Sequence, residues 1–228
     1  MKDKKNKNLK CYPFPQKIDF KKSFTWRVLK IMGEFVEGFE FISELKGKTA
    51  SVFGGTRFSS GHSVYKEAEK LGKLLVKEDY TVVTGGGPGI MEAANKGAYG
   101  AGGNSVGMNI SLPSEQVFNK YLNKSENFHY FFIRKTMLSM ASSVYIFFPG
   151  GFGTLDEFFE MLTLLQTKKL SHSVTIIAVG KEYWQPLFNW FSNELCQKYK
   201  TLSEQDLRLF KIVDTAEEAI KLIKSLKN

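Results

Sequence analysis

A glycine-rich turn between an apolar run and a helical pattern is the feature that most constrains how this chain folds. The run Val144-Tyr145-Ile146-Phe147-Phe148 has the composition of a buried strand, and Pro149-Gly150-Gly151-Phe152-Gly153-Thr154-Leu155-Asp156-Glu157 follows it at once. Glycines in such a turn let the backbone approach a ligand, and the next helix points its free N–H groups at the same place. A tight turn alone explains one or two glycines. Three glycines, a threonine and an acid predict an anion site.

Within this turn we predict Gly150, Gly151, Gly153 and Thr154 as ligands of a phosphate group. Thr154 has a second interpretation, as a first-turn helix residue that satisfies its own backbone. Glu157 is unusual because a carboxylate repels phosphate, although it can hold a sugar hydroxyl or a water. The alternative is that Glu157 only complements the positive end of the helix dipole.

Another turn of the same kind lies upstream; in chain order it is the first glycine turn, and the turn at residues 149–157 is the second. The run Tyr80-Thr81-Val82-Val83-Thr84 is typical of a buried strand, and Gly85-Gly86-Gly87-Pro88-Gly89 then opens a helix. Turns of this kind meet at the carboxyl ends of a parallel sheet, so we predict Gly85, Gly86 and Gly87 as further ligands. Neither turn fits G-x-G-x-x-G, and no P-loop motif occurs. The expected ligand therefore carries one phosphate rather than a dinucleotide or a triphosphate.

Strand and helix patterns alternate along most of the chain. Strands are expected at residues 50–53, 80–84, 105–110, 128–132, 143–148, 174–179 and 210–213. Helices are expected at residues 63–76, 90–101, 134–140, 184–196 and 216–226, and another helix follows the nine-residue turn and runs to about residue 167. This alternation predicts an α/β fold, a doubly wound and mostly parallel, Rossmann-like sheet. We divide the chain into a flexible basic tail (1–20), an N-terminal amphipathic helix (21–46) and a single nucleotide-binding domain (47–228).

The expected N-terminal helix carries apolar residues at helical spacing: Trp26, Leu29, Met32, Phe35, Val36, Phe39 and Ile42. Packing on its own domain is favoured over a membrane-surface role, because Lys and Arg do not line its polar face densely. No apolar run approaches 18 residues and the N-terminus lacks a signal-like stretch, so a cytoplasmic location without membrane attachment is expected. Cys11 and Cys196 are expected to be free thiols.

The net charge of +9 does not by itself indicate nucleic-acid binding. Its 32 basic and 23 acidic residues are dispersed, and five lysines fall within the first ten residues. No aromatic-interleaved basic motif accompanies them, so no nucleic-acid partner is expected. His62, His129 and His172 show no metal-like spacing. We therefore expect no metal and no cofactor.

Three strings together resemble one protein family. Thr84 to Asn95, Arg134-Lys135-Thr136-Met137 and the nine-residue turn occur in the order found in the Lonely Guy (LOG) family. Its members are nucleoside 5′-monophosphate phosphoribohydrolases, many long described as lysine decarboxylases. The resemblance covers about residues 47–226 and favours the longer bacterial branch. Two departures are Ser143, where the family commonly has Asp, and Gly54-Gly55-Thr56-Arg57, where relatives often have Ser-Ala-Arg.

The resemblance implies hydrolysis of the N-glycosidic bond of AMP or a cytokinin riboside monophosphate, which gives free base and ribose 5-phosphate. It also implies that Arg134 and Glu157 are the catalytic pair. Breaking this bond develops positive charge on the ribose, which a carboxylate can stabilise while it orients the attacking water. The Arg134 guanidinium suits the phosphate or departure of the base. A homodimer is implied, with the helix after Arg134 near its interface.

Four further residues are weaker candidates for substrate binding. Lys135 is either a ligand or a solvated helix lysine, and Arg57 either reaches the crevice or is a surface arginine. For Glu92 and Asn109 the resemblance favours substrate contact.

A non-catalytic nucleotide-binding protein with the same loops is the alternative function. Lysine decarboxylation would need a Schiff-base lysine, and the sequence singles out none.

Overall fold

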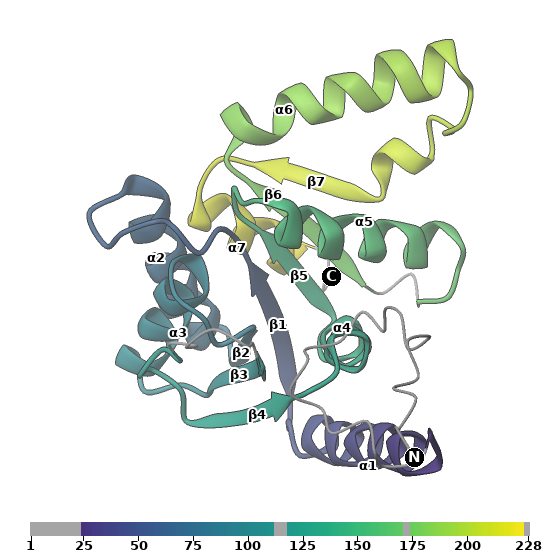
Figure 1. Cartoon of the computed structure of the whole chain (residues 1–228). Coiled ribbons are helices and arrows are strands. Elements are labelled where there is room, and N and C mark those ends of the chain that lie inside the picture. The colour runs from purple at the N-terminus through teal and green to yellow at the C-terminus, as the bar shows by residue number, and fades with distance from the viewer. Residues whose placement is uncertain (1–23, 112–117, 171–173, 226–228) are drawn as a thin grey trace, which may run out of the picture.

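The computed structural model of the protein describes residues 24–111, 118–170 and 174–225, and within them seven parallel strands form one sheet (Figure 1). The sheet order is β4-β3-β2-β1-β5-β6-β7. The strands are β1 (Lys48–Phe53), β2 (Tyr80–Thr84), β3 (Ser105–Ile110), β4 (Lys124–Phe128), β5 (Val144–Phe147), β6 (Thr175–Val179) and β7 (Phe210–Val213). The predicted α/β, doubly wound parallel sheet is confirmed.

Helices follow most of the strands, as a parallel sheet requires of its crossover connections. They are α1 (Phe24–Ser43), α2 (Ser63–Lys77), α3 (Ile90–Gly100), α4 (Phe131–Met140), α5 (Phe152–Gln166), α6 (Lys181–Trp190) and α7 (Ala216–Ser225). A π-helical segment at Phe191–Lys198 extends α6, and a short 3₁₀ turn spans Asp206–Arg208. None of the described helices is long and apolar enough to cross a membrane.

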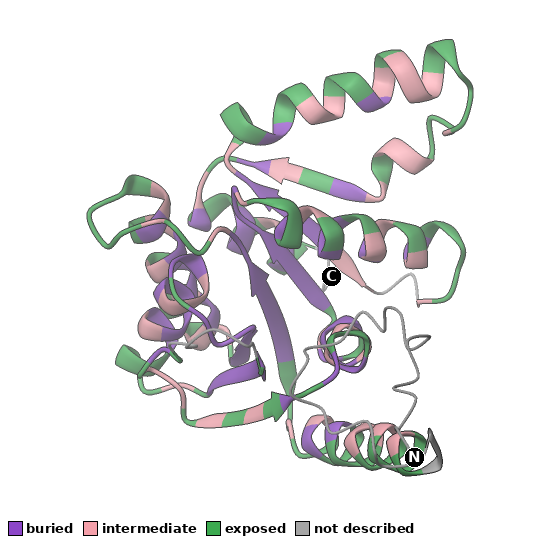
Figure 2. Cartoon of the chain, viewed as in Figure 1, coloured by how far each residue is buried: buried purple, intermediate pink, exposed green. Residues whose placement is uncertain are grey.

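Two apolar cores lie on the two faces of the sheet. One contains side chains of α1, α4, α5 and α6, among them Met137, Phe158 and Trp184. The other contains side chains of α2, α3 and α7, among them Leu71 and Ile90. Strands β2, β3 and β5 are buried along their whole length, and β1 is buried after its first residue, Lys48 (Figure 2). Burial on both faces explains why these strands are continuous apolar runs in the sequence.

The strand expected at 128–132 is wrong in position. The strand is β4, which ends at Phe128, and Phe131 and Phe132 already begin α4. β4 is an edge strand that pairs only with β3, and its first four residues, Lys124 to Asn127, alternate between half-buried and exposed. Its polar composition hid the strand, whereas the apolar run at 128–132 imitated one. The tail proposed at 1–20 lies outside the described residues.

Candidate functional site

The strand order reverses between β1 and β5, and the loops after these strands diverge there to leave a crevice. Backbone hydrogen bonds join three loops at this point. The Gly55 N–H donates to the Pro149 carbonyl at 2.9 Å, and the Ile90 N–H donates to the Gly55 carbonyl at 3.1 Å. The loops after β1, β2 and β5 therefore form one connected rim at the carboxyl edge of the sheet.

A cavity of about 240 Å³ opens at this rim. It contains both predicted catalytic residues, Arg134 and Glu157, together with four of the predicted ligands, Gly85, Gly151, Gly153 and Thr154. The remaining lining residues are Phe53, Gly54, Gly55, Thr56, Met91, Phe131 and Leu138. Residues from five separate segments of the chain thus meet in one cavity, at the place predicted from the turns.

The second glycine turn forms the N-terminus of α5 at the edge of this cavity. Gly151 is the N-cap residue, and its carbonyl accepts the N–H groups of Thr154 and Leu155 at 3.0 and 3.1 Å. A Cβ on Gly151 or Gly153 would meet no atom within 4 Å, so both backbones face open space. Gly150 serves packing instead, because a Cβ there would lie 2.1 Å from the Thr154 hydroxyl oxygen. The geometry suits an anion beside residues 151–153.

Glu157 is the buried acid of the site. It is only 6% exposed, and burial raises the pKa of its carboxyl to about 7, against the opposing effects of Lys135 and Arg134. A carboxylate with this pKa is close to half ionised at neutral pH. It can therefore accept a proton from water or stabilise a developing cation under physiological conditions.

Arg134 is fixed on the first turn of α4. Its Nε donates to the carbonyl of Met108 in β3, at 2.7 Å. A Cβ on Gly85 would stand 2.2 Å from the Arg134 Nη2, so the first glycine turn leaves the space that the guanidinium fills. Burial lowers the pKa of Arg134, and the charge of Glu157 opposes that effect. The cation is thus held in place by the backbone, with its Nη atoms beside the glycine turn.

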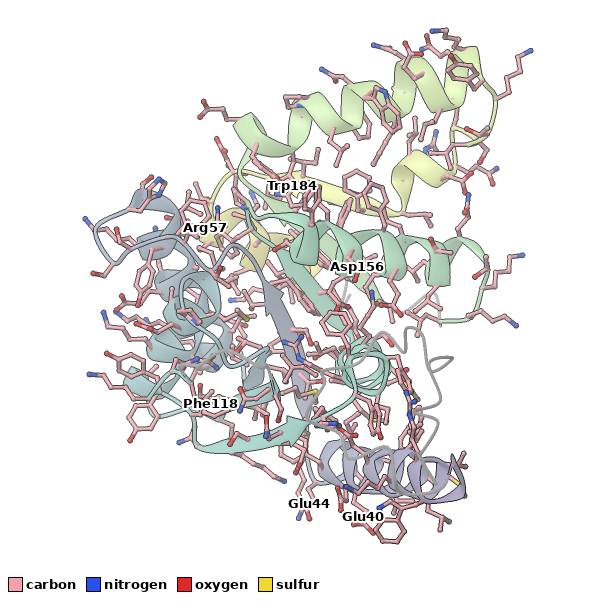
Figure 3. The ribbon with its side chains drawn as sticks, in the orientation of Figure 1. Glu40, Glu44, Arg57, Phe118, Asp156 and Trp184 are labelled. Atoms are coloured by element: carbon pink, nitrogen blue, oxygen red, sulfur yellow. The ribbon has the colours of Figure 1, made fainter. Side chains whose placement is uncertain are left out.

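Lys135 lies outside the lining of the cavity. Its ammonium pairs with Asp156 at 2.5 Å and with Glu160 at 3.1 Å, which ties α4 to the first turns of α5. Asp156, the fifth residue of α5, is labelled beside that helix in Figure 3. This geometry does not support Lys135 as a phosphate ligand. It instead brings a positive charge close enough to lower the pKa of Glu157.

A buried polar network that sequence reasoning missed holds the first glycine turn. The Thr84 hydroxyl donates to Asn95 Oδ1 at 2.6 Å and accepts the Gly86 N–H at 2.9 Å. Asn119 donates to Asn95 Oδ1 at 3.0 Å and to the Gly87 carbonyl at 3.2 Å. The available signal was Asn95 itself, a polar residue in an alanine-rich helical run. Gly86 and Gly87 belong to this support rather than to the cavity lining.

Two predicted ligands lie away from the cavity. Asn109 packs beneath the first turn, where a Cβ on Gly86 would stand 1.7 Å from its Oδ1, and Gly86 has a φ of +69°. The Asn109 Oδ1 is buried and has no hydrogen-bond partner among the described residues. Glu92 instead accepts a hydrogen bond from the Tyr65 hydroxyl of α2 at 3.0 Å. Substrate contact by either residue stays a prediction, and this geometry does not support one by Glu92.

Arg57 faces a larger groove on the outer side of the same rim. The groove, of about 860 Å³, is also lined by His62 and by Phe152, which is 92% exposed. It shares Gly55, Thr56 and Gly151 with the Arg134 cavity, so the two hollows meet at the glycine turn. Arg57 therefore borders the crevice, on the opposite side of the turn from Arg134.

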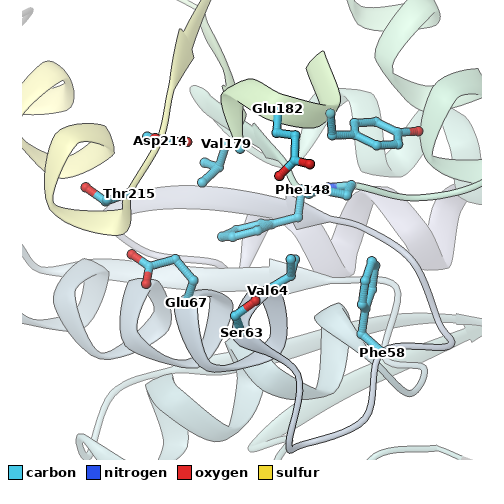
Figure 4. A pocket seen from close by; sticks show the side chains of 12 residues that line it. Phe58, Ser63, Val64, Glu67, Phe148, Val179, Glu182, Asp214 and Thr215 are labelled. Atoms are coloured by element: carbon cyan, nitrogen blue, oxygen red, sulfur yellow. The ribbon is translucent and has the colours of Figure 1, made fainter. Parts of the chain in front are cut away.

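A third hollow, of about 550 Å³, lies beyond the turn between α2, α6 and the loop before α7 (Figure 4). None of its twelve lining residues is basic, and three are acidic. Two of these acids bind helix N-termini: Glu67 accepts the Ala216 N–H at 2.6 Å, and Asp214 accepts the Lys181 N–H at 3.1 Å. Its acidic lining makes this hollow less suited to a phosphate than the Arg134 cavity or the adjoining groove.

The N-terminal helix also contributes to the site, which the sequence did not predict. The Glu34 carboxylate of α1 accepts the backbone N–H groups of His129 and Tyr130, the latter at 3.1 and 3.3 Å. These two residues directly precede α4, whose N-cap residue Tyr130 has no side-chain cap of its own. Glu34 thus caps the helix that carries Arg134.

Sequence comparisons place the chain beside a described family and named relatives. A family model described as "Possible lysine decarboxylase" matches residues 91–223, more than half of the chain. A probable cytokinin riboside 5′-monophosphate phosphoribohydrolase of Oryza sativa subsp. japonica, LOGL5, is 32% identical over 58% of this chain and 54% of its own length. The cytokinin riboside 5′-monophosphate phosphoribohydrolase of Rhodococcoides fascians is 26% identical over 68% of this chain and 79% of its own length. The chain thus spans about half of the length of the first relative.

Solved structures share the fold. The molybdenum cofactor binding protein of Rippkaea orientalis matches with a TM-score of 0.61 at 24% identity, over 81% of this chain and 100% of that one. The molybdenum cofactor carrier protein of Chlamydomonas reinhardtii matches with a TM-score of 0.58 at 20% identity, over 79% and 98%. Because the family model covers more than half of the chain and several relatives carry LOG names, the chain belongs to the LOG family.

Proposed function

We propose that this protein is a nucleoside 5′-monophosphate phosphoribohydrolase that hydrolyses the N-glycosidic bond of AMP or a cytokinin riboside monophosphate. One observation carries the proposal: a buried carboxylate with a pKa near 7 shares a cavity with an arginine and with the open N-terminus of α5. An anion site, a fixed cation and a titratable acid are the three groups that this reaction needs. The names of the curated relatives support the same reaction.

In the proposed mechanism the 5′-phosphate lies against residues 151–154, where the α5 N-terminus favours negative charge. Ionised Glu157 then faces the ribose. It orients a water and takes its proton while the bond from C1′ to the base nitrogen breaks, and its charge stabilises the oxocarbenium-like transition state. Arg134 holds the substrate phosphate or the departing base. The base leaves with the bonding electron pair and is protonated, and the water oxygen becomes the hydroxyl at C1′.

The alternative is a nucleotide-binding protein that uses the same loops without turnover. Lysine decarboxylation receives no support from the cavity, since none of its thirteen lining residues is a lysine and the nearby Lys135 is paired with two acids. Arg57, Gly85, Gly151 and Gly153, which line the two adjoining hollows, are proposed to contact the phosphate and the ribose. A cytoplasmic location and a homodimer remain part of the proposal.

Base release decides between the enzyme and the binder. Purified protein is incubated with AMP, ADP, ATP and adenosine, and adenine and ribose 5-phosphate are separated by chromatography. Equimolar adenine and ribose 5-phosphate from AMP would support the hydrolase. AMP binding by calorimetry, with no adenine released by wild type at any pH between 6 and 9, would favour the binder.

A further inference from the structure

The carbonyl groups at the start of the second glycine turn all accept hydrogen bonds. Those of Pro149 and Gly151 accept backbone N–H groups. The carbonyl between them, of Gly150, accepts the hydroxyl of Tyr183 on α6 at 2.6 Å. Among the described residues, Tyr183 is thus the one side chain that binds a carbonyl of these three residues.

The N–H groups of the same turn are in the opposite condition. Those of Gly151, Phe152 and Gly153 donate no hydrogen bond within residues 24–111, 118–170 and 174–225. They stand at the start of α5, a helix of 15 residues, where the helix dipole favours negative charge. Such N–H groups bind one anion together only when each points at the same place. The direction of each peptide in the turn therefore decides how well it holds a phosphate.

Tyr183 fixes the direction of the peptide that joins Gly150 to Gly151. This peptide is planar, and no cis peptide bond occurs in the described residues, so its carbonyl and its N–H point in opposite directions. A carbonyl held by Tyr183 on the α6 side therefore turns the Gly151 N–H away from α6. With glycine on both sides, the peptide plane meets little steric resistance to turning over, so a hydrogen bond is needed to select this orientation.

Tyr183 is itself held firmly in the first turn of α6. The N-cap residue of this helix is Gly180, whose φ of +99° favours glycine, and its carbonyl accepts the Tyr183 N–H at 3.1 Å. The next residue, Trp184, is buried and donates its Nε1 hydrogen to the Val179 carbonyl at 3.1 Å. The rings of Tyr183 and Trp184 are in contact, with their centroids 5.0 Å apart. The Tyr183 hydroxyl therefore reaches the turn already ordered, so its hydrogen bond costs little entropy.

We propose that Tyr183 is a positioning residue for the substrate phosphate, and this inference rests on the proposed function, which places the phosphate against residues 151–154. The phenol has one hydrogen, and the Gly150 carbonyl takes it, so Tyr183 acts through the turn and not by donating to the phosphate. Without the phenol, the Gly150 carbonyl is free to rotate toward the ligand, where its oxygen repels the phosphate and one N–H donor is lost. The loss falls on phosphate binding, because Glu157 lies more than one turn further along α5 than Gly151.

The test compares the full wild-type chain with Tyr183→Phe, which removes the hydroxyl and keeps the ring. Titration calorimetry measures the affinities for AMP and for inorganic phosphate, and adenine release gives kcat and KM. Tyr183→Phe should weaken both affinities and raise the KM for AMP roughly 3- to 10-fold, as the loss of one hydrogen bond does. The kcat at saturating AMP should stay nearly unchanged, because the lost interaction holds the phosphate equally in the ground state and the transition state. Far-UV circular dichroism and Tm confirm that each variant is folded.

Two further variants complete the test. Tyr199→Phe removes a hydroxyl from an exposed tyrosine that follows the π-helical segment, and it should change neither affinity. Tyr183→Leu also removes the ring, and it should weaken AMP binding at least as much as Tyr183→Phe does. Unchanged affinities for AMP and phosphate in folded Tyr183→Phe overturn the inference, as does a loss confined to Tyr183→Leu, which would make the ring a wall of the groove that Arg57 lines. A wild type that binds AMP without releasing adenine refutes the proposed reaction alone, because the two affinities still test Tyr183.

Discussion

Replacing Glu157 with glutamine gives two predictions of opposite sign from one substitution. Gln has nearly the same shape as a protonated Glu but cannot ionise. Because Glu157 is proposed to stabilise charge that appears only in the transition state, Glu157→Gln should lower kcat for AMP by roughly 100-fold or more. The affinity for AMP should change little, since the phosphate is held elsewhere in the site.

The same substitution should raise stability in neutral and alkaline solution. The pKa of this carboxyl rises from 4.5 to about 7 on folding. The folded state therefore holds a proton that the unfolded state has lost, and wild-type stability falls as pH rises through that window. This difference in pKa between the unfolded and folded states corresponds to about 3 kcal/mol. The stability of Glu157→Gln relative to wild type should thus increase by about that amount between pH 4.5 and pH 8.

Two measurements check these expectations. Adenine release is followed by chromatography from pH 5 to pH 9, and wild-type kcat/KM should rise with pH until Glu157 is ionised, near pH 7. Urea unfolding at pH 4.5 and pH 8 supplies the two stability differences. Normal turnover by folded Glu157→Gln would refute the catalytic role. An equal stability difference at both pH values would refute the burial argument.

Four further outcomes are expected. AMP should be cleaved and adenosine should not, because the phosphate supplies most of the orientation; equal turnover of the two in the base-release assay would contradict this. Arg134→Ala should weaken AMP binding and lower turnover together. Arg134→Lys should retain only part of the wild-type affinity and turnover, because an ammonium cannot form the paired hydrogen bonds of the planar guanidinium; titration calorimetry measures the affinity and kcat the turnover. Glu34→Ala should lower stability by about 1 kcal/mol through loss of the cap on α4 and slow AMP turnover roughly 3- to 10-fold, whereas Glu34→Gln should keep most of both. Lys135→Met should raise the pKa of Glu157 and move the rise of kcat/KM to higher pH; an unmoved profile would show that Lys135 only packs.

The sequence predicted the parts of this molecule that depend on local pattern. Buried parallel strands such as Tyr80–Thr84 are short apolar runs, and the turns after them need glycine, so both can be read directly. The position of β4 was predicted wrongly because an edge strand has polar residues on its exposed side. The resemblance to the LOG family assigned Arg134 and Glu157 to the site, and the two share one cavity because both lie near helix N-termini at the carboxyl edge of the sheet.

The missed parts depend on contacts between distant segments. Glu34 caps a helix that begins about 95 residues later, and no local pattern marks a carboxylate for that role. Asn95 and Asn119 were missed for the same reason, because their hydrogen bonds to the first glycine turn exist only after α3 packs on the sheet. Glu92 was assigned to the site from its position at a helix end. Its side chain instead turns toward Tyr65 on the neighbouring helix.

The environment of Glu157 combines two opposing demands. Burial strengthens the interaction of the carboxylate with a developing cation, since the local dielectric is low, but burial also favours the protonated form that cannot act as a base. Lys135 and Arg134 on α4 lower the pKa of Glu157, whereas the negative charges of Glu160 and Asp156 raise it and so act in the same direction as burial. The Lys135 ion pairs to both acids fix this balance in the α4 to α5 contact. Glu34 of α1 caps α4, so the N-terminal helix supports the contact between α4 and α5 although it lies outside the matched residues 91–223. We therefore expect removal of α1 to alter the pH dependence of activity as well as the stability of the protein.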